Sequence, residues 1–372
     1  MKLSDFDYKY PEDAIAIRPP KVRGTSKLFV VYTQTGEIDI LKYKDLPKVL
    51  TGGDILIRNV TKVINSRIFT TDIVIGEQTK QKAIEILILS SGSIVFAEYL
   101  SRQFDRHSQS FFLPVLVRAK QKLKEKVTWY LFKEGWKGRI VLRDGEQYLE
   151  LFYPKAINNS AAISALLKFL EKHGGTPIPP YLKRTDDKGD KERYQTVFGT
   201  QLGSAAAPTA SLNFTNEIEA KLKRKGVYLT DVTLHVGLGT FAPLYENTIE
   251  KNTLHAEVYN APEETLQLCK DSLNSARKII AMGTTAMRAI ESAAINSNNE
   301  IAATNLFIYH PYNFKIITGL LTNFHVPQSS LLVLVDAFLR YKNSKLSWKH
   351  IYEFAIKNDA KLFSYGDSML II

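Results

Sequence analysis

The sequence predicts an α/β protein, in which a layered α/β main domain carries an inserted small β-barrel domain. Two features of the chain lead to this prediction. Over residues 155–372, segments with the spacing of amphipathic helices alternate with short apolar runs that suit buried strands. Over residues 67–153, short β-rich runs follow one another, separated by turns. We therefore expect residues 1–66 and 154–372 to form a discontinuous main domain, and residues 67–153 to form the inserted barrel.

The composition is that of a globular protein with a basic surplus. The chain has 372 residues, of which 45% are apolar and 23% charged, and this suits two or three domains of ~150 residues each. Lys and Arg exceed Asp and Glu by 49 − 38 = 11. Such a surplus favours an anionic partner, such as nucleic acid, a phosphorylated ligand or an anionic membrane. The single cysteine, Cys269, excludes an intrachain disulfide and a zinc–thiolate site.

Two further features of the sequence indicate where in the cell the protein works. The first residues, MKLSDFDYKY, lack the apolar region of a signal peptide. The apolar run at 331–339 is interrupted by Asp336 and is shorter than the ~20 residues that cross a bilayer. We therefore expect a cytoplasmic protein that binds no membrane and no metal, and, from its size and charge, a monomer.

The predicted elements of the first 153 residues are mostly strands. Strands are expected at 27–32 and 55–57, with a helix or turn at 46–50 between them. In the inserted segment, strands are expected at 70–75, 83–89, 94–99, 126–132, 138–142 and 148–152, with no amphipathic helix among them.

Basic and aromatic residues are interleaved in the inserted segment. The lysines Lys120, Lys122, Lys124 and Lys126 precede Trp129, Tyr130, Phe132 and Trp136. Such a mixture can bind nucleic acid, because cations meet phosphates and rings stack on bases. Alternating lysines also protect edge strands from aggregation, and this alternative stays open.

Helices and strands are predicted to alternate after residue 154. We expect helices at 160–173 (with Ser160 as N-cap), 261–275, 286–294 and 330–341, and strands at 232–236, 278–282, 306–309 and 314–317. The charged segment 185–193 is expected to be mobile. The turn Gly283-Thr284-Thr285 places backbone N–H groups and hydroxyls at a helix N-terminus, which favours a phosphate or a carboxylate.

The stretch 203–257 is the most informative part of the chain. It opens with the small residues GSAAAPTAS, which let the backbone come close to another segment or to a ligand. His235, His255 and Glu257 lie in its second half. The stretch therefore indicates either a small-molecule pocket or tight helix–sheet packing, and composition alone does not separate the two.

A succession of motifs goes beyond such general patterns. In order they are ERYQTVF at 192–198, GSAAAPTASLNFT at 203–215, KGVYLTDVTLHVGLGTFAPL at 225–244, LHAE at 254–257, GTTAMRAIES at 283–292, LLTNFHVPQSSLLVLVDAF at 320–338 and LFSYGDSMLI at 362–371. Together with DFDY at 5–8 and NVTKVINSR at 59–67, they resemble the S-adenosylmethionine:tRNA ribosyltransferase-isomerase family of queuosine biosynthesis. The inserted segment resembles this family only loosely, through KQKLKEK at 120–126.

The resemblance implies a fold, an activity and partners. Family members have an α/β domain with an inserted β-barrel. They transfer the ribosyl part of S-adenosylmethionine onto the amine of 7-aminomethyl-7-deazaguanine at the tRNA wobble position, and isomerise it to give epoxyqueuosine, adenine and methionine. The implied partners are therefore S-adenosylmethionine, as co-substrate, and tRNA that carries this base.

The implied chemistry needs a base for the proton beside the sulfonium, an acid for the leaving adenine and sites for anions. Titratable side chains within the matching motifs are the candidates for proton transfer: His235, His255, Glu257, His325 and Asp367. The candidates for substrate binding are Arg67, Arg193, Thr209, Asn213, Thr284, Thr285, Arg288, Asn323 and Tyr365. Each candidate has a structural alternative as a buried, hydrogen-bonded side chain, and the base is not assigned among them.

Several positions depart from the family pattern. Asn213 stands where a histidine is expected, Gln328 where a lysine is, and Val60 where Asn or Asp is usual. Because an Asn side chain cannot shuttle a proton, a second hypothesis is a divergent relative that binds S-adenosylmethionine or a nucleoside but uses another acceptor or has lost catalysis. A third hypothesis, suggested by the basic surplus, is a non-catalytic RNA-binding protein.

Overall fold

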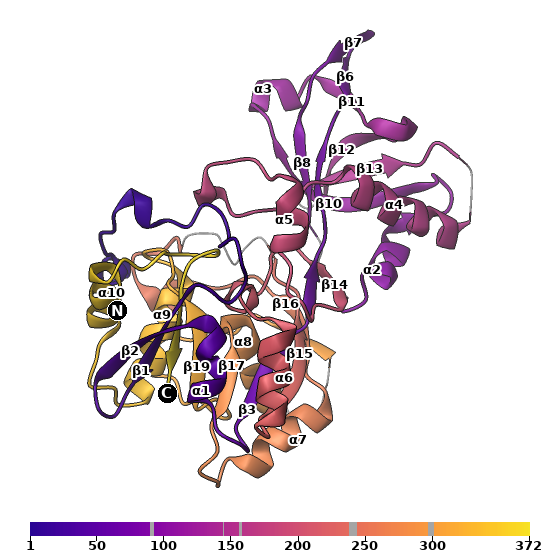
Figure 1. Ribbon diagram of the computed structural model, residues 1–372. Helices are drawn as coiled ribbons and strands as arrows, with labels where there is room; N and C mark the ends of the chain where they lie inside the picture. Colours follow the sequence, from indigo (N-terminus) through magenta and orange to yellow (C-terminus); the bar gives the residue numbers. More distant parts are fainter. Residues whose placement is uncertain (90–92, 144, 156–157, 238–243, 297–300) are drawn as a thin grey trace.

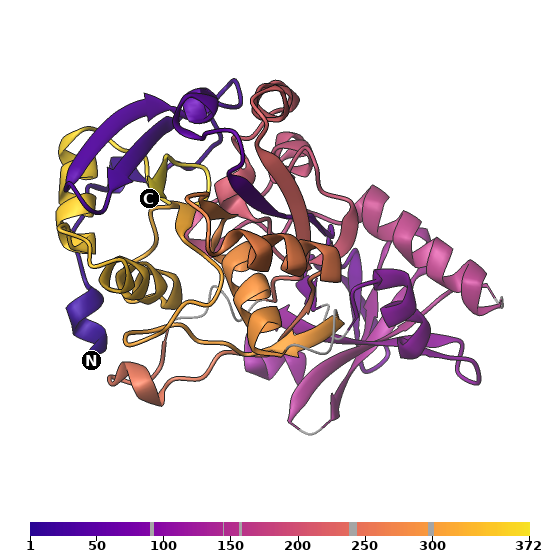
Figure 2. The same ribbon diagram turned by 90° about the horizontal axis from the view of Figure 1, so that it is seen from below.

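The molecule has two lobes, each built around a large β-sheet (Figure 1). The structure is a computed structural model and describes residues 1–89, 93–143, 145–155, 158–237, 244–296 and 301–372. Both chain termini lie in the lobe that contains α8, and the other lobe contains the strands of residues 67–152 (Figure 1). A view from below shows the same separation of the two lobes (Figure 2).

The main sheet has nine strands that come from both ends of the sequence. Their order across the sheet is β18 (Ile301–Thr304), β16 (Glu257–Asn260), β15 (Tyr228–Leu234), β3 (Ile55–Asn59), β17 (Ile279–Met282), β19 (Gly319–Asn323), β20 (Ser368–Ile371), β1 (Lys27–Tyr32) and β2 (Glu37–Lys42). Strands β15, β3, β17 and β19 run parallel to one another, and β20 runs parallel to β1. The remaining pairs are antiparallel.

Helices cover both faces of this sheet. Alternate residues of a strand point to opposite faces, and because the buried strands are apolar on both faces, each face must be shielded from water. In β3, Ile55 and Ile57 belong to the larger core cluster and Leu56 to the other. The larger cluster also takes residues from α7 (Glu263–Ser272), α8 (Thr284–Ile295), α9 (Ser330–Tyr341) and α10 (Trp348–Lys357). The second takes residues from α1 (Leu46–Val49) and α6 (Asn216–Arg224).

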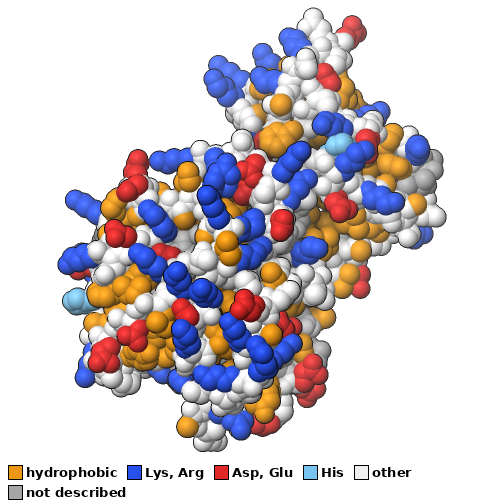
Figure 3. Space-filling view, in the orientation of Figure 1, with side chains coloured by type: hydrophobic (Ala, Val, Ile, Leu, Met, Phe, Trp, Pro, Cys, Tyr) orange, Lys and Arg blue, Asp and Glu red, His pale blue; other side chains and the backbone are white. Residues whose placement is uncertain are grey.

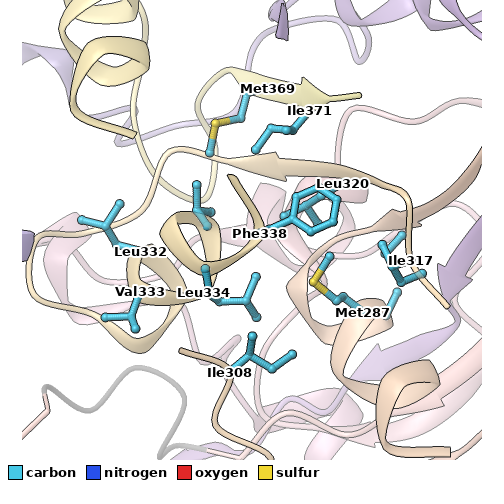
Figure 4. Packing of buried hydrophobic residues seen from close by; sticks show 14 of the residues in the cluster. Met287, Ile308, Ile317, Leu320, Leu332, Val333, Leu334, Phe338, Met369 and Ile371 are labelled. Carbon is cyan, nitrogen blue, oxygen red and sulfur yellow. The ribbon is translucent and has the colours of Figure 1, made fainter. Parts of the chain in front are cut away.

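Helix α9 fits its place because it is apolar on nearly all sides. Its side chains Leu332, Leu334 and Phe338 lie among Leu320 of β19 and Met369 of β20 (Figure 4). Ser329 caps the helix by accepting a hydrogen bond from the N–H of Leu332 at 3.3 Å. The predicted helix at 330–341 is confirmed.

The second sheet belongs to the other lobe. Its path is β5 (Arg67–Phe69), β8 (Glu85–Ile88), β10 (Ser110–Arg118), β13 (Glu146–Phe152), β12 (Lys137–Arg143), β11 (Val127–Leu131), β6 (Asp72–Ile75) and β7 (Gln78–Gln81), and β9 (Phe104–Asp105) pairs with β10. Residues of α2 (Phe96–Gln103) and α4 (Asn159–His173) belong to the same buried cluster as this sheet. The mixed α/β architecture with two large sheets is established, and the closed barrel stays a prediction.

Several predicted elements were wrong in type or position. Helix α2 replaces the strand expected at 94–99, because Phe96, Tyr99 and Leu100 have helical spacing and bury one face. Residues 306–309 and 314–317 form no strand, and β18 lies earlier in the chain. Helix α8 starts at Thr284, two residues before the predicted start.

The N-terminus of α4 differs from expectation, and the charged segment contains a helix, while its mobility stays a prediction. Asn158, rather than Ser160, caps α4 by accepting a hydrogen bond from the N–H of Ala161 at 2.9 Å. The segment 185–193 contains the short helix α5 (Lys188–Arg193). Asp187 caps α5, and Asp190 binds the guanidinium of Arg184 at 2.6 and 2.8 Å, so this segment is held by specific contacts.

The two lobes are joined through a small two-stranded sheet and its neighbours. Strand β4 (Thr61–Val63) pairs with β14 (Gln201–Ser204) in parallel. At the start of β5, Arg67 forms a β-bridge with Gly175 on the segment that returns from α4. The short helix α3 (Gln121–Lys124) lies near the far end of the second lobe (Figure 1).

Candidate functional site

The carboxyl ends of the parallel strands bring several predicted residues to one edge of the main sheet. Strands β3, β15, β17 and β19 end at Asn59, Leu234, Met282 and Asn323. The residues that follow them include His235, Thr284, Thr285 and His325. In open α/β sheets, ligands bind outside the carboxyl ends of the strands, so a ligand-binding site is expected at this edge.

A cavity of about 270 Å³ opens at the end of β19. Four chain segments form it, and its lining residues are Pro180, Tyr181, Thr209, Asn323, Phe324, His325, Val326, Pro327, Gln328, Ser329, Leu331, Phe363 and Ser364. Thr209, Asn323 and His325, which the sequence singled out, therefore line a common space, and Gln328 lies there too.

A hydrogen-bond network fixes Asn323 in the cavity wall. Thr209 donates from Oγ1 to Asn323 Oδ1 at 2.8 Å, and Asn323 donates from Nδ2 to the carbonyl oxygen of Asp367 at 3.2 Å. The Asp367 carboxylate accepts hydrogen bonds from the backbone N–H groups of Lys27 at 2.6 Å and Lys361 at 2.7 Å. Burial raises the pKa of Asp367. Its observed contacts are therefore those of a side chain that joins the C-terminal loop to β1.

His325 brings an ionisable imidazole to the cavity wall. Its Nε2 lies 2.9 Å from Thr322 Oγ1, its backbone N–H donates to Tyr352 Oη at 2.9 Å, and its carbonyl accepts from Tyr8 Oη at 2.6 Å. Burial lowers the pKa of His325 to about 3. The imidazole is therefore neutral near pH 7, so it can accept a proton but holds it weakly.

Glu257 and Arg288 form a second, buried cluster. Glu257 starts β16, and Arg288 lies in the second turn of α8; their side chains form an ion pair. Glu257 Oε1 accepts from the N–H of Gly237 at 2.9 Å, and Arg288 Nε donates to the carbonyl of Leu306 at 3.0 Å. Arg288 Nη2 is buried and has no hydrogen-bond partner among the described residues.

His235 and Thr285 lie in a third group at the carboxyl edge. His235 Nδ1 lies 2.7 Å from Thr61 Oγ1, and Nε2 lies 2.9 Å from the carbonyl of Ile94, which belongs to the other lobe. Because a carbonyl only accepts, Nε2 carries the proton and His235 spans the two lobes. Burial lowers its pKa. Thr285 Oγ1 accepts from Asn59 Nδ2 at 3.0 Å.

The small residues at 203–207 allow neighbouring segments of the protein to pack closely. A Cβ atom on Gly203 would overlap the His235 imidazole, and Ala205, Ala206 and Ala207 are buried. In this part of the stretch, close packing is the role that the structure supports.

The remaining predicted binding residues are used in contacts within the protein. Arg67 pairs with Glu85 at 3.0 Å and with Asp186 at 3.1 Å. Arg193 donates to the carbonyl of Pro20 at 2.7 Å, and Tyr365 donates to Asp190 Oδ1 at 2.7 Å. Asn213 Oδ1 accepts from the N–H of Gly24 at 3.4 Å, whereas His255 is exposed to solvent.

The expected base-stacking surface of the second lobe is wrong for most of its rings. Tyr130, Phe132 and Trp136 are buried in the core of that lobe. Trp129 is partly exposed, and Lys137 Nζ lies 4.8 Å above its ring. Figure 3 shows Lys and Arg side chains spread over both lobes on the face seen in Figure 1, rather than gathered in one patch.

Several residues that shape the site were not predicted from the sequence. Tyr181, Phe363 and Ser364 also line the cavity; Phe363 and Ser364 lie in the motif LFSYGDSMLI at 362–371, from which only Tyr365 and Asp367 were singled out. Glu291 of α8 is fully buried and accepts hydrogen bonds from three consecutive N–H groups of the loop before β19. A signal for Glu291 existed, since a carboxylate within an otherwise apolar helix must have buried partners.

Two absences within the described residues concern metals and membranes. No group of three or more His, Cys, Asp or Glu side chains within them could hold a metal ion. In the same part of the chain, no helix has the length and apolar character needed to cross a membrane.

With a cavity at the carboxyl edge of a mixed sheet, the chain has the architecture of an α/β protein that binds a small molecule. The family described as "Queuosine biosynthesis protein" matches residues 3–371, so the chain belongs to this family. It is 36% identical over 373 residues to the S-adenosylmethionine:tRNA ribosyltransferase-isomerase of Sulfurihydrogenibium sp. (strain YO3AOP1), and both chains are covered completely. It is 38% identical over 379 residues to the protein of the same name from Halothermothrix orenii, again with complete coverage of both.

A solved structure gives the same assignment. The crystal structure of S-adenosylmethionine tRNA ribosyltransferase from Thermotoga maritima has a TM-score of 0.51 and 27% identity, and the match covers 99% of this chain and 100% of that one.

Proposed function

We propose that this protein transfers and isomerises the ribosyl part of S-adenosylmethionine onto 7-aminomethyl-7-deazaguanine at the tRNA wobble position. The products are epoxyqueuosine in tRNA, adenine and methionine. The observation that carries the proposal is the end-to-end similarity, at 36–38% identity, to relatives named for this activity. S-adenosylmethionine is the co-substrate in this proposal, and tRNA with the modified base is the acceptor.

The cavity at the end of β19 is the proposed substrate site. Thr209 and Asn323 offer polar atoms at its wall, and His325 offers a neutral imidazole. A neutral imidazole can take up the proton that must leave the carbon beside the sulfonium. We assign this role to His325 rather than to His235, because both ring nitrogens of His235 already have partners within the protein.

The second cluster suits an anionic part of a substrate. Arg288 Nη2 is a buried donor without an acceptor among the described residues, and Thr284 and Thr285 begin the same helix. Buried donors are normally paired. A substrate carboxylate or phosphate is therefore the proposed acceptor for Arg288, with Glu257 holding the guanidinium in place.

Further parts of the proposal concern organisation. We propose that residues 67–153 form an inserted domain whose sheet curves into a barrel, and that α4 packs with it. The protein is proposed to act as a cytoplasmic monomer. Its basic surplus of 49 − 38 = 11 charges supports an RNA partner.

A divergent relative with another acceptor is the second candidate, and Gln328 favours it. Gln328 lines the cavity at a position where the resembling family has a lysine. The change from a cation to a neutral amide alters what this wall can bind. Asn213 favours the divergent candidate less, because it is buried and its observed bond is to the backbone of Gly24.

Adenine release tests the proposal. Purified protein is incubated with S-adenosylmethionine and tRNA that carries 7-aminomethyl-7-deazaguanine, and adenine is measured by liquid chromatography. We expect release that requires the modified tRNA and falls at least 100-fold in His325→Gln. The matched control is His350→Gln, an exposed histidine on α10, which should keep full activity. If no adenine forms while the protein still binds S-adenosylmethionine, the divergent candidate replaces the proposal; if only RNA is bound, the protein is a non-catalytic RNA-binding protein.

A further inference from the structure

We propose that the cavity at the end of β19 holds the adenine base of S-adenosylmethionine, and that Asn323 and Thr209 bind the ring edge that carries N6 and N7. This inference rests on the proposed function, because it takes S-adenosylmethionine as the substrate and assigns its adenine base to Asn323 and Thr209.

The size and the walls of the cavity suit a single flat ring system. Its volume of about 270 Å³ lies just below the ~300–1,000 Å³ that small-molecule pockets usually have. The walls are largely apolar and include Tyr181 and Phe363, whose ring centroids lie 5.1 Å apart in an edge-to-face arrangement. Val326 and Pro327 add aliphatic surface. Aromatic and aliphatic walls favour a planar base, which buries both of its faces.

Asn323 and Thr209 can each still form one more hydrogen bond after their bonds to each other and to Asp367 are counted. The Asn323 amide has a fixed orientation, because Nδ2 faces the carbonyl oxygen of Asp367 at 3.2 Å and a carbonyl can only accept. Asn323 Oδ1 takes the hydroxyl proton of Thr209 at 2.8 Å. What remains is one N–H on Asn323 Nδ2 and acceptor lone pairs on Thr209 Oγ1. The pair therefore offers one donor beside one acceptor.

Adenine presents the matching edge. Its N7 accepts a hydrogen bond and its N6 amine donates one, and asparagine commonly binds this edge in nucleic-acid complexes. We place N7 opposite Asn323 Nδ2 and the N6 amine opposite Thr209 Oγ1.

The acceptor base fits this site less well. A 7-deazaguanine has carbon in place of N7, so the Asn323 donor would lose that acceptor. Its aminomethyl nitrogen, which must attack the ribosyl group, would also point into the cavity wall. The base of S-adenosylmethionine is therefore the occupant that we assign.

Two independent binding measurements test the assignment. In the first, the wild-type protein is titrated by calorimetry with S-adenosylmethionine and with its analogue that has carbon in place of N7, with and without tRNA. We expect the analogue to bind about 10-fold more weakly, because the Asn323 N–H is left unpaired. Equal affinities would overturn the assignment, and so would a failure of S-adenosylmethionine to bind in either condition.

In the second measurement, Val326→Phe fills the cavity, and Val22→Phe, at a residue that is 63% exposed, is the matched control. We expect Val326→Phe to weaken S-adenosylmethionine at least 10-fold and Val22→Phe to change its affinity less than twofold. Unchanged affinity in Val326→Phe overturns the assignment. So does loss of binding of free 7-aminomethyl-7-deazaguanine with S-adenosylmethionine unaffected, since the cavity would then belong to the acceptor base.

The adenine-release assay separates this inference from the proposed function. Cavity-dependent binding of S-adenosylmethionine without tRNA-dependent release would keep the inference and remove the function. Release by a Val326→Phe protein with wild-type affinity would keep the function and remove the inference.

Discussion

Replacement of Glu291 should loosen the loop that leads into β19. The carboxylate is fully buried on α8. Its Oε1 accepts from the N–H groups of Ile316 and Ile317, both at 2.9 Å, and its Oε2 accepts from the N–H of Lys315 at 2.7 Å and from Tyr312 Oη at 3.3 Å. One side chain therefore satisfies three consecutive backbone donors in the loop directly before β19, the strand that ends at Asn323 in the cavity wall.

The size of the effect follows from the number of donors left without an acceptor. In Glu291→Gln, the remaining oxygen can keep Ile316 and Ile317, whereas the new NH₂ group faces the N–H of Lys315. The part-buried N–H of Lys315 then lacks its acceptor, at a cost of about 2 kcal/mol, within the ~1–3 kcal/mol range for donors left without a partner. Glu291→Ala leaves all three donors unpaired and should cost about 4–6 kcal/mol.

Amide hydrogen exchange is the assay, because it reports on the loop itself. A loss of about 2 kcal/mol corresponds to ~30-fold faster exchange at Lys315, Ile316 and Ile317 in Glu291→Gln. Glu353→Gln, at an exposed position of α10, is the matched control and should change nothing. Exchange at these three amides within threefold of wild type in Glu291→Gln would refute the reasoning.

Three further predictions concern the other clusters. Arg288→Met should lower the free energy of unfolding by about 3–5 kcal/mol, because it leaves the Glu257 carboxylate buried without the Arg288 cation. In urea titrations, the double variant Arg288→Met/Glu257→Gln should regain at least half of this lost stability. A double variant no more stable than Arg288→Met alone would contradict the prediction. The pKa of His325 lies at about 3, below the ~6.5 of an unfolded histidine, so its contribution to stability is present above pH 6.5 and is lost as the pH falls toward 3. Ring resonances of His325 that titrate near pH 6 in NMR spectra would disprove that. Gly203→Ala should cost about 1–3 kcal/mol, because its Cβ would overlap the His235 ring; an unchanged melting temperature would show that the ring has room to move.

Strong local patterns made much of the fold predictable. The apolar helix at 330–341 and the strand at 27–32 appear with the predicted bounds, because their apolar runs are long and bounded by polar or turn residues. The strand expected at 94–99 became α2 because packing of its apolar face against the second sheet decides the conformation of a short apolar run. Strand pairing between distant segments, such as β1 with β20, left no local signal.

The sequence motifs predicted which residues lie at the site. They did not predict which hydrogen-bond or ion-pair partners each side chain has. Thr209, Asn323 and His325 do line one cavity. Arg67, by contrast, is a typical phosphate-binding residue in sequence, yet Glu85 and Asp186 neutralise it. A sequence shows which side chains can bind an anion, but only the fold shows whether the protein itself already supplies that anion.

Mass spectrometry of the tRNA product tests the proposed activity most directly. tRNA that carries 7-aminomethyl-7-deazaguanine is incubated with the protein and S-adenosylmethionine, digested to nucleosides and analysed. We predict that the modified base is converted to epoxyqueuosine and that one adenine is released for each conversion. Intact 7-aminomethyl-7-deazaguanine in the tRNA, after incubation with a folded protein that binds both substrates, would contradict the proposed activity.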